Sequence, residues 1–481
     1  MPAAERPPAS PELPPAVARR LADVLPPDRL LLDPADRLAY GYDNSRRVAM
    51  PQAVVLAQSV TEVQAVVDAC RDARLPLIAR GRGTNTTGAT VPIHGGVVLS
   101  MERMNRILRV SPGDRLLECE AGALNGEVQA AAAKHGLFWA PDPTSAVYST
   151  VGGNLACGAG GPRAVKYGTA RDNVLGLRAI AGTGARLTTG CYTTKGVVGY
   201  DLTRLLIGSE GTLALITQAA LKLLPKPETT RMLRAAYRDV EAAAAAVARL
   251  MAQPETPSAL EFLDGDAVQL AQAHRDCGLP AACGALLLIE CDGSHAAIEQ
   301  VVAAVSAAAA GDGLIDLQAA RNAAEAENLW AARKALSPAL RSLAPKKVNE
   351  DVAVPVSRLP ELIRGVGALS RRHGIRIVCF GHAGNGNIHV NLLADPDDPA
   401  QMVAIEACLH EVFRLVLSLE GTLSGEHGVG IDKRDFVAWE IDAPTLSMMH
   451  AVKRAFDPAG ILNPGKALPA DPSSTPPNPE P

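Results

Sequence analysis

The sequence predicts an α+β protein built from two domains, and three observations point to it. At 481 residues the chain is too long for a single hydrophobic core. As far as about residue 226, short β-type runs alternate with helical segments and carry most of the glycine clusters. After a break at PKPE (225–228), alanine-rich helical stretches alternate with apolar strands. We therefore expect a first domain over 16–226 and a second over 227–468.

Composition narrows the class of protein. Apolar residues make up 47% of the chain and charged residues 20%, as in ordinary globular proteins. A net charge of −4 without polybasic runs gives no reason to expect a nucleic-acid partner. No apolar run approaches the ~20 residues of a membrane-spanning helix, and the first residues lack the order of a secretory signal. A cytoplasmic protein is expected.

The chain ends and the cysteines are also informative. Residues 1–15 and 469–481 are rich in Pro with Ala or Ser, and we expect them to be disordered tails. The nine cysteines are odd in number and include no C-x-x-C pair, which argues against a disulfide scaffold and a cysteine-ligated iron–sulfur cluster. We interpret them as reduced core residues, although Cys157 and Cys379 lie inside motifs described below.

Hydrophobic patterning predicts the elements of both domains. In the first domain we expect a strand at 53–59, an amphipathic helix at 61–75 with Ser59 or Thr61 near its N-cap, and strands at 75–80 and 95–101. In the second we expect helices at 240–251 and 298–310 and an apolar strand at 285–292.

The loop RGRGTNTTG (80–88) directly follows a predicted strand. Its glycine spacing misses the dinucleotide fingerprint G-x-G-x-x-G, and a phosphate loop would need Lys-Ser/Thr after Gly88. What remains is a loop of small and hydroxylated residues whose backbone amides can bind an anion, with Arg80 or Arg82 nearby. A tight turn at the end of a strand explains this loop alone equally well.

Two further segments favour a ligand. PDPTSAVYSTVGGNLACGAGG (141–161) contains GGN (152–154) and GAGG (158–161). A core segment would not hold so many glycines, because each loses extra entropy on folding and fills no space. Backbone lying close against a large flat ligand is the simplest cause. LLIGSEGTLALIT (205–217) places two more glycines before another strand.

In the second domain, RIVCFGHAGNGNIHVNLL (376–393) predicts a strand, a turn and a returning strand. A glycine-asparagine turn brings His382 near the start of the returning strand. His389 and Asn391 are two residues apart and therefore face the same side of the sheet. Histidines beside turns are usually surface or hydrogen-bonding residues, so this pair needs support from elsewhere in the chain.

Taken together, these motifs resemble a known family. The three glycine segments are similar to the FAD-binding domain of the vanillyl-alcohol oxidase/p-cresol methylhydroxylase superfamily. HAGNGNIH, SGEHGVG (424–430) and FDPAGILNPGK (456–466) resemble the C-terminal domain of its FAD-linked D-2-hydroxyacid dehydrogenase branch. The likeness extends over 35–468. It implies a two-subdomain, non-Rossmann FAD-binding domain followed by an α+β, ferredoxin-like cap to about residue 429, with 430–468 returning to the flavin domain.

The resemblance also implies which residues bind FAD. They are Arg80, Gly81, Gly83, Thr84, Asn85, Gly88, Pro141, Asp142, Gly152, Gly153, Asn154, Gly160, Gly161, Glu210, Gly211, Ile216 and Asn463. The first loop lacks the histidine that often anchors a covalent flavin, so FAD is expected to be non-covalent. Gly158 stands where many relatives have asparagine, which removes one polar contact to the flavin.

A divalent metal site is predicted beside the flavin. His382, His389 and Glu426 provide two imidazoles and a carboxylate and leave a coordination position open, a pattern typical of catalytic zinc. Manganese or iron would also suit these ligands. By resemblance, His427 is the general base.

The substrate contacts are predicted in the same way. Arg333 is expected to bind the substrate carboxylate, because a guanidinium suits that group. Lys347 and Asn391 are further substrate contacts, with Lys346 an equal candidate to Lys347.

The implied reaction is oxidation of a D-2-hydroxy acid, D-lactate-like, to the 2-oxo acid by hydride transfer to FAD. D-2-hydroxyglutarate and glycolate remain alternative substrates. So does a role as the flavin subunit of a multi-subunit glycolate oxidase and, more remotely, as a non-redox flavin-dependent ether-lipid synthase. A quinone, a cytochrome or an electron-transfer flavoprotein would accept the electrons, which could bring the protein to a membrane surface. No nicotinamide fingerprint is present, and a homodimer is the default oligomer.

Overall fold

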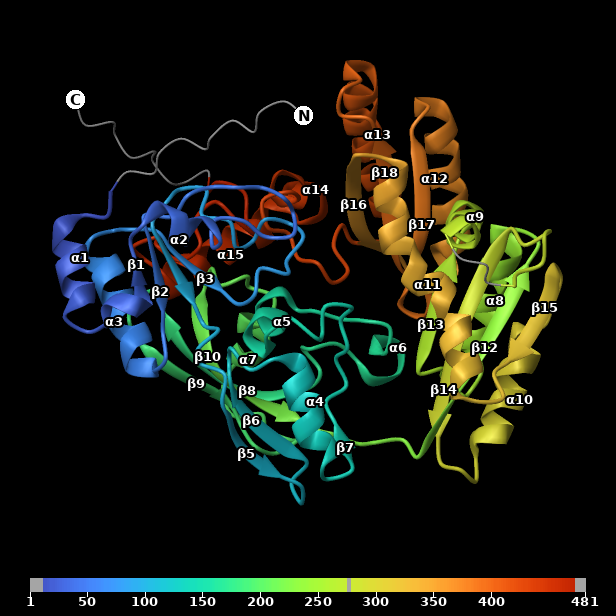
Figure 1. The fold of residues 1–481 in the computed structure, drawn as a ribbon, viewed down its shortest axis with the longest axis horizontal. Coiled ribbons are helices and arrows are strands. Elements are labelled where there is room, and N and C mark those ends of the chain that lie inside the picture. The colour runs from blue at the N-terminus through green and yellow to red at the C-terminus, as the bar shows by residue number, and fades with distance from the viewer. Residues whose placement is uncertain (1–11, 275–277, 472–481) are drawn as a thin grey trace. The chain divides into compact units, whose positions relative to one another are not determined.

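The computed structural model describes residues 12–274 and 278–471, so most of the two predicted tails lies outside the described residues. Contacts divide the chain into two units. The first contains the residues up to Ala159, Thr169–Lys226 and the segment from Glu426 onward. The second contains Gly160–Gly168 and Pro227–Gly425. Each unit is described separately below (Figure 1).

The first unit contains two main sheets. The four-stranded sheet has the order β1 (Leu30–Leu31), β2 (Ala53–Leu56), β4 (Val97–Ser100), β3 (Leu77–Arg80). The five-stranded sheet has the order β5 (Ile107–Ser111), β6 (Leu116–Glu120), β10 (Ala214–Lys222), β8 (Val174–Ala181), β9 (Arg186–Gly190). A small pair joins β7 (Leu137–Phe138) to β11 (Leu224–Pro225). In the first sheet β2, β4 and β3 run parallel, whereas the second sheet is antiparallel throughout.

Helices accompany these sheets in the first unit. They are α1 (Pro15–Ala22), α2 (Pro34–Leu38), α3 (Val60–Asp72), α4 (Asn125–Ala133), α5 (Val151–Cys157), α7 (Leu202–Leu206), α14 (Val437–Glu440) and α15 (Ala443–Phe456). The predicted helix at 61–75 is α3, and its N-cap is Ser59, whose hydroxyl accepts a bond from the Glu62 amide at 3.2 Å. The Glu62 carboxylate in turn accepts from the Gln58 amide at 2.8 Å, so the helix start is fixed from both sides.

The parallel strands of the first sheet are buried. All four residues of β2 and of β4 are buried, as expected for strands covered on both faces. The C-terminal segment adds to the edge of this sheet, because the Leu77 amide donates to the Ile461 carbonyl at 2.8 Å and the Asn463 amide donates to the Leu77 carbonyl at 2.9 Å. The last motif of the sequence is therefore built into the first unit.

The second unit is a seven-stranded antiparallel sheet with helices. Its order is β15 (Leu314–Ala319), β12 (Thr229–Tyr237), β14 (Ala285–Gly293), β13 (Ala259–Leu263), β17 (Arg376–His382), β18 (Asn387–Ala394), β16 (Lys346–Ala353). The helices are α6 (Ala164–Tyr167), α8 (Val240–Ala252), α9 (Gly265–His274), α10 (Ile298–Ala309), α11 (Ala323–Leu343), α12 (Leu359–His373) and α13 (Pro399–Ser418). The strand expected at 285–292 and the helices expected at 240–251 and 298–310 correspond to β14, α8 and α10.

Both faces of this sheet are covered. Leu263, Phe380 and Leu393 pack with apolar residues of α9 and α11. Val390 and Leu392, whose neighbours in sequence face the other way, are also fully buried. α12 and α13 contact β17 and β18. The predicted hairpin thus lies inside the unit, between two helical layers.

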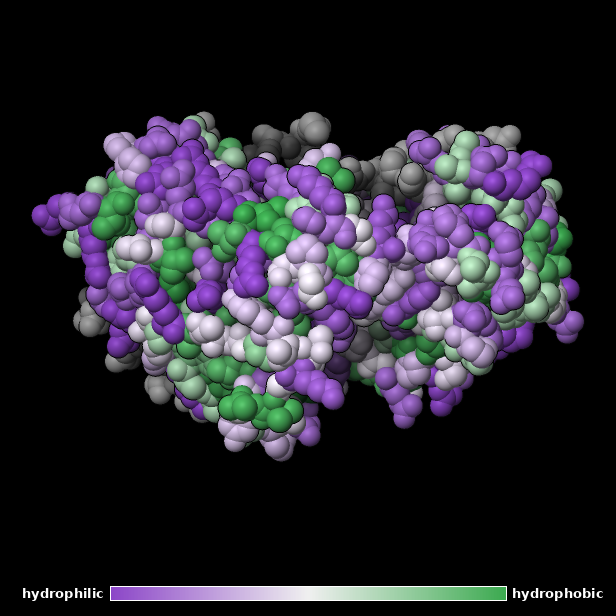
Figure 2. Space-filling model, turned by 90° about the horizontal axis from the view of Figure 1, so that it is seen from below, coloured by the Kyte–Doolittle hydropathy of each residue, from purple (hydrophilic) through white to green (hydrophobic). Residues whose placement is uncertain are grey.

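The surface of the protein is mostly hydrophilic, as its composition leads us to expect. Hydrophilic side chains cover most of the face seen in Figure 2, and hydrophobic ones form separate patches. Among the described residues, no helix has both the length and the apolar character needed to cross a bilayer.

Candidate active site

A pocket in the first unit brings the glycine motifs together. Sequence-predicted residues that line it are Arg80, Gly81, Gly152, Gly153, Glu210, Gly211 and Ile216. The sequence reasoning missed the small residues between them: Ala79, Ala89, Thr90, Ala121, Thr150, Ala156 and Ala214. Their alanine and threonine side chains are common in any core, so the sequence carried no distinct signal for them.

Close backbone approach explains two of the glycines. A Cβ on Gly152 would lie 2.7 Å from the Cβ of Ala121, and a Cβ on Gly81 would overlap the Thr150 hydroxyl. That hydroxyl is the N-cap of α5 and accepts a bond from the Gly153 amide at 3.1 Å. The first and second glycine motifs therefore touch, and their open backbone forms a cradle that side chains would fill.

The first loop is held by its own polar residues. Asn85 Oδ1 accepts bonds from the Thr87 amide at 2.9 Å and the Ala89 amide at 3.0 Å. The buried Arg80 guanidinium donates to the carbonyls of Tyr42 at 2.6 Å and Ala39 at 3.3 Å. Both side chains therefore shape the loop, and direct contact of either with FAD stays a prediction.

Most of the other predicted flavin residues belong to the same unit, and their contact with FAD stays a prediction. Gly83, Thr84 and Gly88 belong to the same loop, and Asn154 lies on α5. The Pro141 carbonyl accepts from Asn125 at 3.2 Å, and Asp142 follows it. The Asn463 amide group donates to the carbonyls of Ala89 at 2.9 Å and Glu210 at 2.7 Å.

The contacts of Gly160 and Gly161 assign them to the second unit, and their contact with FAD stays a prediction. Cys157, on α5, has its pKa raised to about 12 by burial, so it is a neutral thiol rather than a nucleophile. None of the cysteines in the described part of the chain forms a disulfide.

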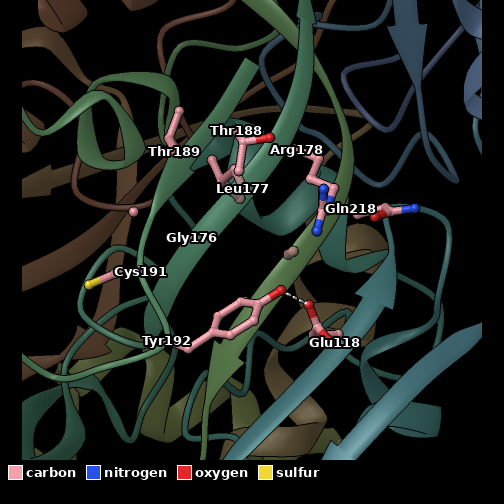
Figure 3. Close-up of a pocket in the computed structure, with 12 residues that line it drawn as sticks. Glu118, Gly176, Leu177, Arg178, Thr188, Thr189, Cys191, Tyr192 and Gln218 are labelled. Atoms are coloured by element: carbon pink, nitrogen blue, oxygen red, sulfur yellow. Dashed lines mark hydrogen bonds between the residues drawn. The ribbon is translucent and has the colours of Figure 1, made fainter. Parts of the chain in front are cut away.

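A second hollow lies on the five-stranded sheet and is separate from the glycine motifs (Figure 3). Its lining includes Arg178, Gln218 and Tyr192, whose hydroxyl donates to Glu118. The pairing of β10 with β8 shifts register between Ile216 and Gln218, the point of the strand that lies between the two pockets. Residues 214–216 of β10 line the motif pocket, and residues 218–220 line the outer hollow.

In the second unit, strand register collects the predicted residues on one face of the sheet. The directly opposed pairs are Glu261–His382, Phe380–His389, Asp351–His389 and Asn349–Asn391. Opposed residues share a face, as do residues two apart on one strand. We call this set, together with Lys347, the histidine face. Lys346 points to the opposite face, so register distinguishes two lysines that the sequence left equal.

Glu261 organises the histidine face, although the sequence analysis did not identify it. Its carboxylate binds His382 Nδ1 and accepts from Arg333 Nε at 2.8 Å. Burial raises the pKa of Glu261, but the charges of His382 and Arg333 and their hydrogen bonds outweigh burial and hold this pKa well below its usual range. Because Nδ1 is engaged by the carboxylate, Nε2 is the His382 nitrogen suited to a metal.

The aromatic rings complete the arrangement. The rings of His382 and His389 lie edge to face with centroids 5.3 Å apart. Phe380 lies 5.7 Å from the His389 ring, and the Arg333 guanidinium stacks over Phe380 at 4.7 Å. Both histidines are buried, and Asp351 Oδ1 lies 3.9 Å from His389 Nδ1. Two imidazoles are thus held side by side in a water-poor site.

Asn391 and Asn349 present acceptors on this face. The Asn391 amide group donates to the carbonyls of Val378 and His389, both at 3.0 Å. Its Oδ1 is buried and has no hydrogen-bond partner among residues 12–274 and 278–471, and the same is true of Asn349 Oδ1. Asn391 can therefore accept a hydrogen bond from a ligand but has no donor left to give. Asn349 was missed, and its place opposite Asn391 could be known only from the register.

Glu426 and His427 begin the C-terminal part of the first unit, although the sequence predicted a cap extending to about residue 429. Glu426 directly follows Gly425, whose amide donates to the Asp351 carbonyl at 3.1 Å. The His427 carbonyl accepts from Asn85 Nδ2 at 3.0 Å in the first unit. Their roles as metal ligand and base remain predictions.

Comparison with protein families assigns both parts of the chain. Residues 226–467 match the family described as FAD linked oxidases, C-terminal domain, and residues 51–190 match an FAD binding domain. The chain belongs to the FAD-linked oxidases. The resemblance seen in the motifs is thereby confirmed. The glycine cradle of the first unit suits the flavin that this family implies.

Several relatives of this FAD-linked oxidase extend over most of its length. "Glycolate oxidase subunit GlcD" of Bacillus subtilis is 37% identical over 95% of this chain and 97% of that protein. "D-lactate dehydrogenase" of Anaerostipes hadrus is 34% identical over 87% and 90%. "D-2-hydroxyglutarate dehydrogenase" of Stutzerimonas stutzeri is 31% identical over 95% and 99%.

Solved structures confirm the fold class. p-Cresol methylhydroxylase with substrate bound superimposes with a TM-score of 0.76 at 16% identity, over 94% of this chain and 96% of that one. Alkyldihydroxyacetonephosphate synthase gives a TM-score of 0.73 at 20% identity, over 95% and 86%. At these identities the likeness concerns the fold alone. The predicted combination of a non-Rossmann flavin domain with an α+β cap is correct, and the protein is an FAD-linked oxidoreductase.

Proposed function

We propose that this FAD-linked oxidase is a divalent-metal-dependent dehydrogenase that converts a short D-2-hydroxy acid, such as D-lactate, into the 2-oxo acid. The observation that carries the proposal is the pair of buried histidines, His382 and His389, with Glu261 oriented against one ring. Metal-binding histidines commonly give their second nitrogen to a carboxylate, which sets the tautomer and increases ligand basicity. An oxidoreductase with no metal would have little reason to bury two imidazoles in contact.

The metal would be held by His382, His389 and Glu426, with zinc favoured and manganese or iron as alternatives. The donor set fits, because two imidazoles and a carboxylate leave coordination positions for a hydroxy acid. Glu426 is one peptide bond from Gly425, which is anchored beside Asp351 opposite His389. A divalent cation at these residues supplies charge that favours the alkoxide form of a hydroxyl group.

The chain's own residues bind the substrate and move its proton. Arg333 uses Nε to bind Glu261, so its terminal nitrogens are the donors for the substrate carboxylate. Asn391 Oδ1 accepts a hydrogen bond, which suits a hydroxyl or water and not a carboxylate. His427 takes the hydroxyl proton as general base. FAD, bound non-covalently, supplies the hydride acceptor.

A reduction assay tests this proposal. Purified holoenzyme is mixed anaerobically with D- and L-lactate, and bleaching of the visible flavin band is followed before and after treatment with a chelator. We expect D-lactate to bleach the flavin, L-lactate to have little effect, and chelation to abolish bleaching until a divalent cation is restored. Reduction by the L-isomer alone, or full activity after verified metal removal, would contradict the proposal.

A second candidate is the flavin subunit of a glycolate-oxidising complex. It is favoured by the name of the Bacillus subtilis relative, which is called a subunit and matches nearly the full chain. Glycolate and D-2-hydroxyglutarate belong in the same assay. Reoxidation of the reduced flavin by a quinone, a cytochrome or an electron-transfer flavoprotein then identifies the acceptor. Mass measurement of the native protein distinguishes a homodimer from a subunit that needs a partner.

A further inference from the structure

Glu210 makes contacts that its place in a glycine motif does not predict. Although it lines the flavin pocket, its carboxylate binds the C-terminal segment. Oε1 accepts from the Val429 amide at 2.5 Å, and Oε2 accepts from the Gly430 amide at 2.8 Å. Two successive amides therefore share one buried carboxylate, as in the backbone nests that bind anions. Burial raises the pKa of Glu210, while these amides and the charges of Lys466 and Lys433 act in the opposite direction.

The backbone on both sides is adapted to this contact. Glu210 has a φ of +52°, which is uncommon for a residue with a side chain and costs energy. Gly428 and Gly430 have φ values of +83° and +52°. A Cβ on Gly428 would overlap Glu210 Oε1, and a Cβ on Gly430 would overlap the Thr87 carbonyl. The two glycines of the sequence GVG are thus required by Glu210 and by the first flavin loop.

The flavin loop holds the same segment from its other end. Asn85 Nδ2 donates to the His427 carbonyl at 3.0 Å, and the Ile431 amide donates to the Thr87 carbonyl at 2.8 Å. Residues 427–431, which include His427, are thus held at both ends: Asn85 donates to them, and Glu210 and Thr87 accept from them. All of these groups belong to the first unit.

We propose that Glu210 is a positioning residue for His427, which it orients by binding the Val429 and Gly430 amides. This inference rests on the proposed function, in which His427 is the base. Through Glu210 and Asn85, the loops that line the flavin pocket also set the backbone that carries the proton acceptor. A base must reach its proton within hydrogen-bonding distance, and a displacement of about 1 Å can cost about 100-fold in rate.

Glu210→Gln tests the proposal with little change in size. Glutamine keeps one acceptor and turns an NH₂ group toward the other backbone amide, which should displace the segment. We expect FAD content, measured from the visible and protein absorption bands, to remain unchanged. The rate of flavin reduction at saturating D-lactate is expected to fall by about 100-fold. Glu210→Asp keeps two acceptors and should recover part of the rate.

Asp457→Asn is the matched control. Asp457 is also buried in the first unit, and its carboxylate accepts from two successive amides, those of Ile461 at 3.1 Å and Leu462 at 2.8 Å. We expect this variant to lower stability and leave the rate of flavin reduction per bound FAD within about twofold of the wild type, because it is not bonded to residues 427–431. Equal loss of rate in both variants would identify a general structural effect and overturn the positioning role.

A double variant separates positioning from other effects. If Glu210 acts through His427, adding Glu210→Gln to His427→Gln should slow flavin reduction no further than His427→Gln alone. Multiplied losses, or loss of FAD from Glu210→Gln, would overturn the proposal.

Hydrogen exchange gives a readout that does not depend on the substrate. Protection of the Val429 and Gly430 amides should fall in Glu210→Gln and not in Asp457→Asn. Unchanged protection would overturn the role of Glu210 even if the enzyme oxidises hydroxy acids. A wild-type enzyme that no 2-hydroxy acid reduces, with the expected change in protection, would instead contradict the proposed function.

Discussion

Glu261 carries two tasks at once, since it orients His382 and neutralises Arg333 in a fully buried position. Its low pKa means that Glu261→Gln removes a charge that is present near neutral pH. An amide can bind one of the two partners well but cannot balance the arginine. We expect the affinity for zinc to fall by about 10- to 100-fold, as for other residues that orient metal ligands. Metal content after dialysis against graded zinc buffers measures this without reference to activity.

Glu290→Gln is the control for that change. Glu290 is a partly buried carboxylate on the neighbouring strand β14, where it accepts from Ser258 at 3.0 Å and lies 3.4 Å from Arg163. It has no bond to either histidine among the described contacts, so zinc affinity should be unchanged. Equal affinities of wild type and Glu261→Gln would show that the metal is held elsewhere.

Lys466 gives the first unit a pH-dependent stability. Its ammonium donates to Asn463 Oδ1 at 2.6 Å, and burial lowers its pKa to about 7 although Glu210 and Asp43 act in the opposite direction. Between this value and the ordinary lysine pKa of about 10.4, the unfolded chain binds a proton that the folded chain releases. The free energy of unfolding should therefore rise with pH above about 7, by up to about 1.4 kcal/mol per pH unit.

Lys466→Met should lack this rise, because it has no proton to release. Urea unfolding of both proteins at pH 7, 8 and 9 provides the measurement. The wild type is expected to gain stability relative to the variant over this range. Parallel curves would mean that Lys466 keeps its ordinary pKa in the folded protein.

For single residues, the sequence predicted those whose type and local motif indicate a function. It missed those whose position depends on which strands pair. His382 and His389 were found because two histidines flank a glycine turn. Glu261 lies 121 residues before His382 in the chain, so only the pairing of β13 with β17 could reveal it. Asn349 depended in the same way on the pairing of β16 with β18.

Among the elements, the β17–β18 hairpin has a turn whose backbone requires a glycine. Gly386 has a φ of +69°, and a Cβ there would overlap the Val354 carbonyl. Gly386→Ala therefore adds a steric conflict to the cost of a left-handed backbone, which alone is about 1–2 kcal/mol. Gly374, after α12, has a φ of +64° and nothing within 4 Å of its Cβ position. Gly374→Ala is thus a matched variant with backbone strain only.

We expect Gly374→Ala to lower the free energy of unfolding by about 1–2 kcal/mol and to leave zinc affinity intact. Gly386→Ala should cost more than this and should weaken zinc binding, because the turn separates the two histidines. Denaturant titration and zinc titration test the pair. Similar losses in both variants would show that the Val354 contact relaxes without moving the hairpin.

Local turn chemistry explains why this hairpin could be predicted from the sequence, along with Ser59 as the cap of α3. The bulge in β10 could not be predicted, because nothing in LIT (215–217) departs from an ordinary strand. That bulge lies between the residues of β10 that line the motif pocket (214–216) and those that line the outer hollow (218–220). Strand identity is local, whereas the direction in which a side chain points can depend on a single extra residue.

For the whole molecule, the chain passes between its two units more often than its composition indicates. The shift at PKPE coincides with the passage at Lys226, but Gly160–Gly168 also belongs to the second unit. There Lys166 and Tyr167 bind Asp292, at 2.5 and 2.6 Å, and a Cβ on Gly384 would overlap Val165. A glycine-rich stretch following a flavin motif gives no local sign that it packs against the histidine hairpin.

FAD and the metal should each protect a different set of backbone amides from hydrogen exchange. Removal of zinc by a chelator is expected to speed hydrogen exchange in β17 and β18, while FAD removal should speed it in residues 80–90 and in α5. A ligand at about 100 times its dissociation constant stabilises the state that binds it by about 2.7 kcal/mol, equivalent to about 100-fold in exchange for segments that open with its release. Strand β12 and helix α3 serve as internal controls, because neither carries a predicted ligand residue. If chelation left hydrogen exchange in the hairpin unchanged, the histidine face would hold no metal. If chelation sped exchange in residues 80–90 as well as in the hairpin, FAD and metal binding would be coupled. Gly160–Gly168 would then be the first segment to test for that coupling.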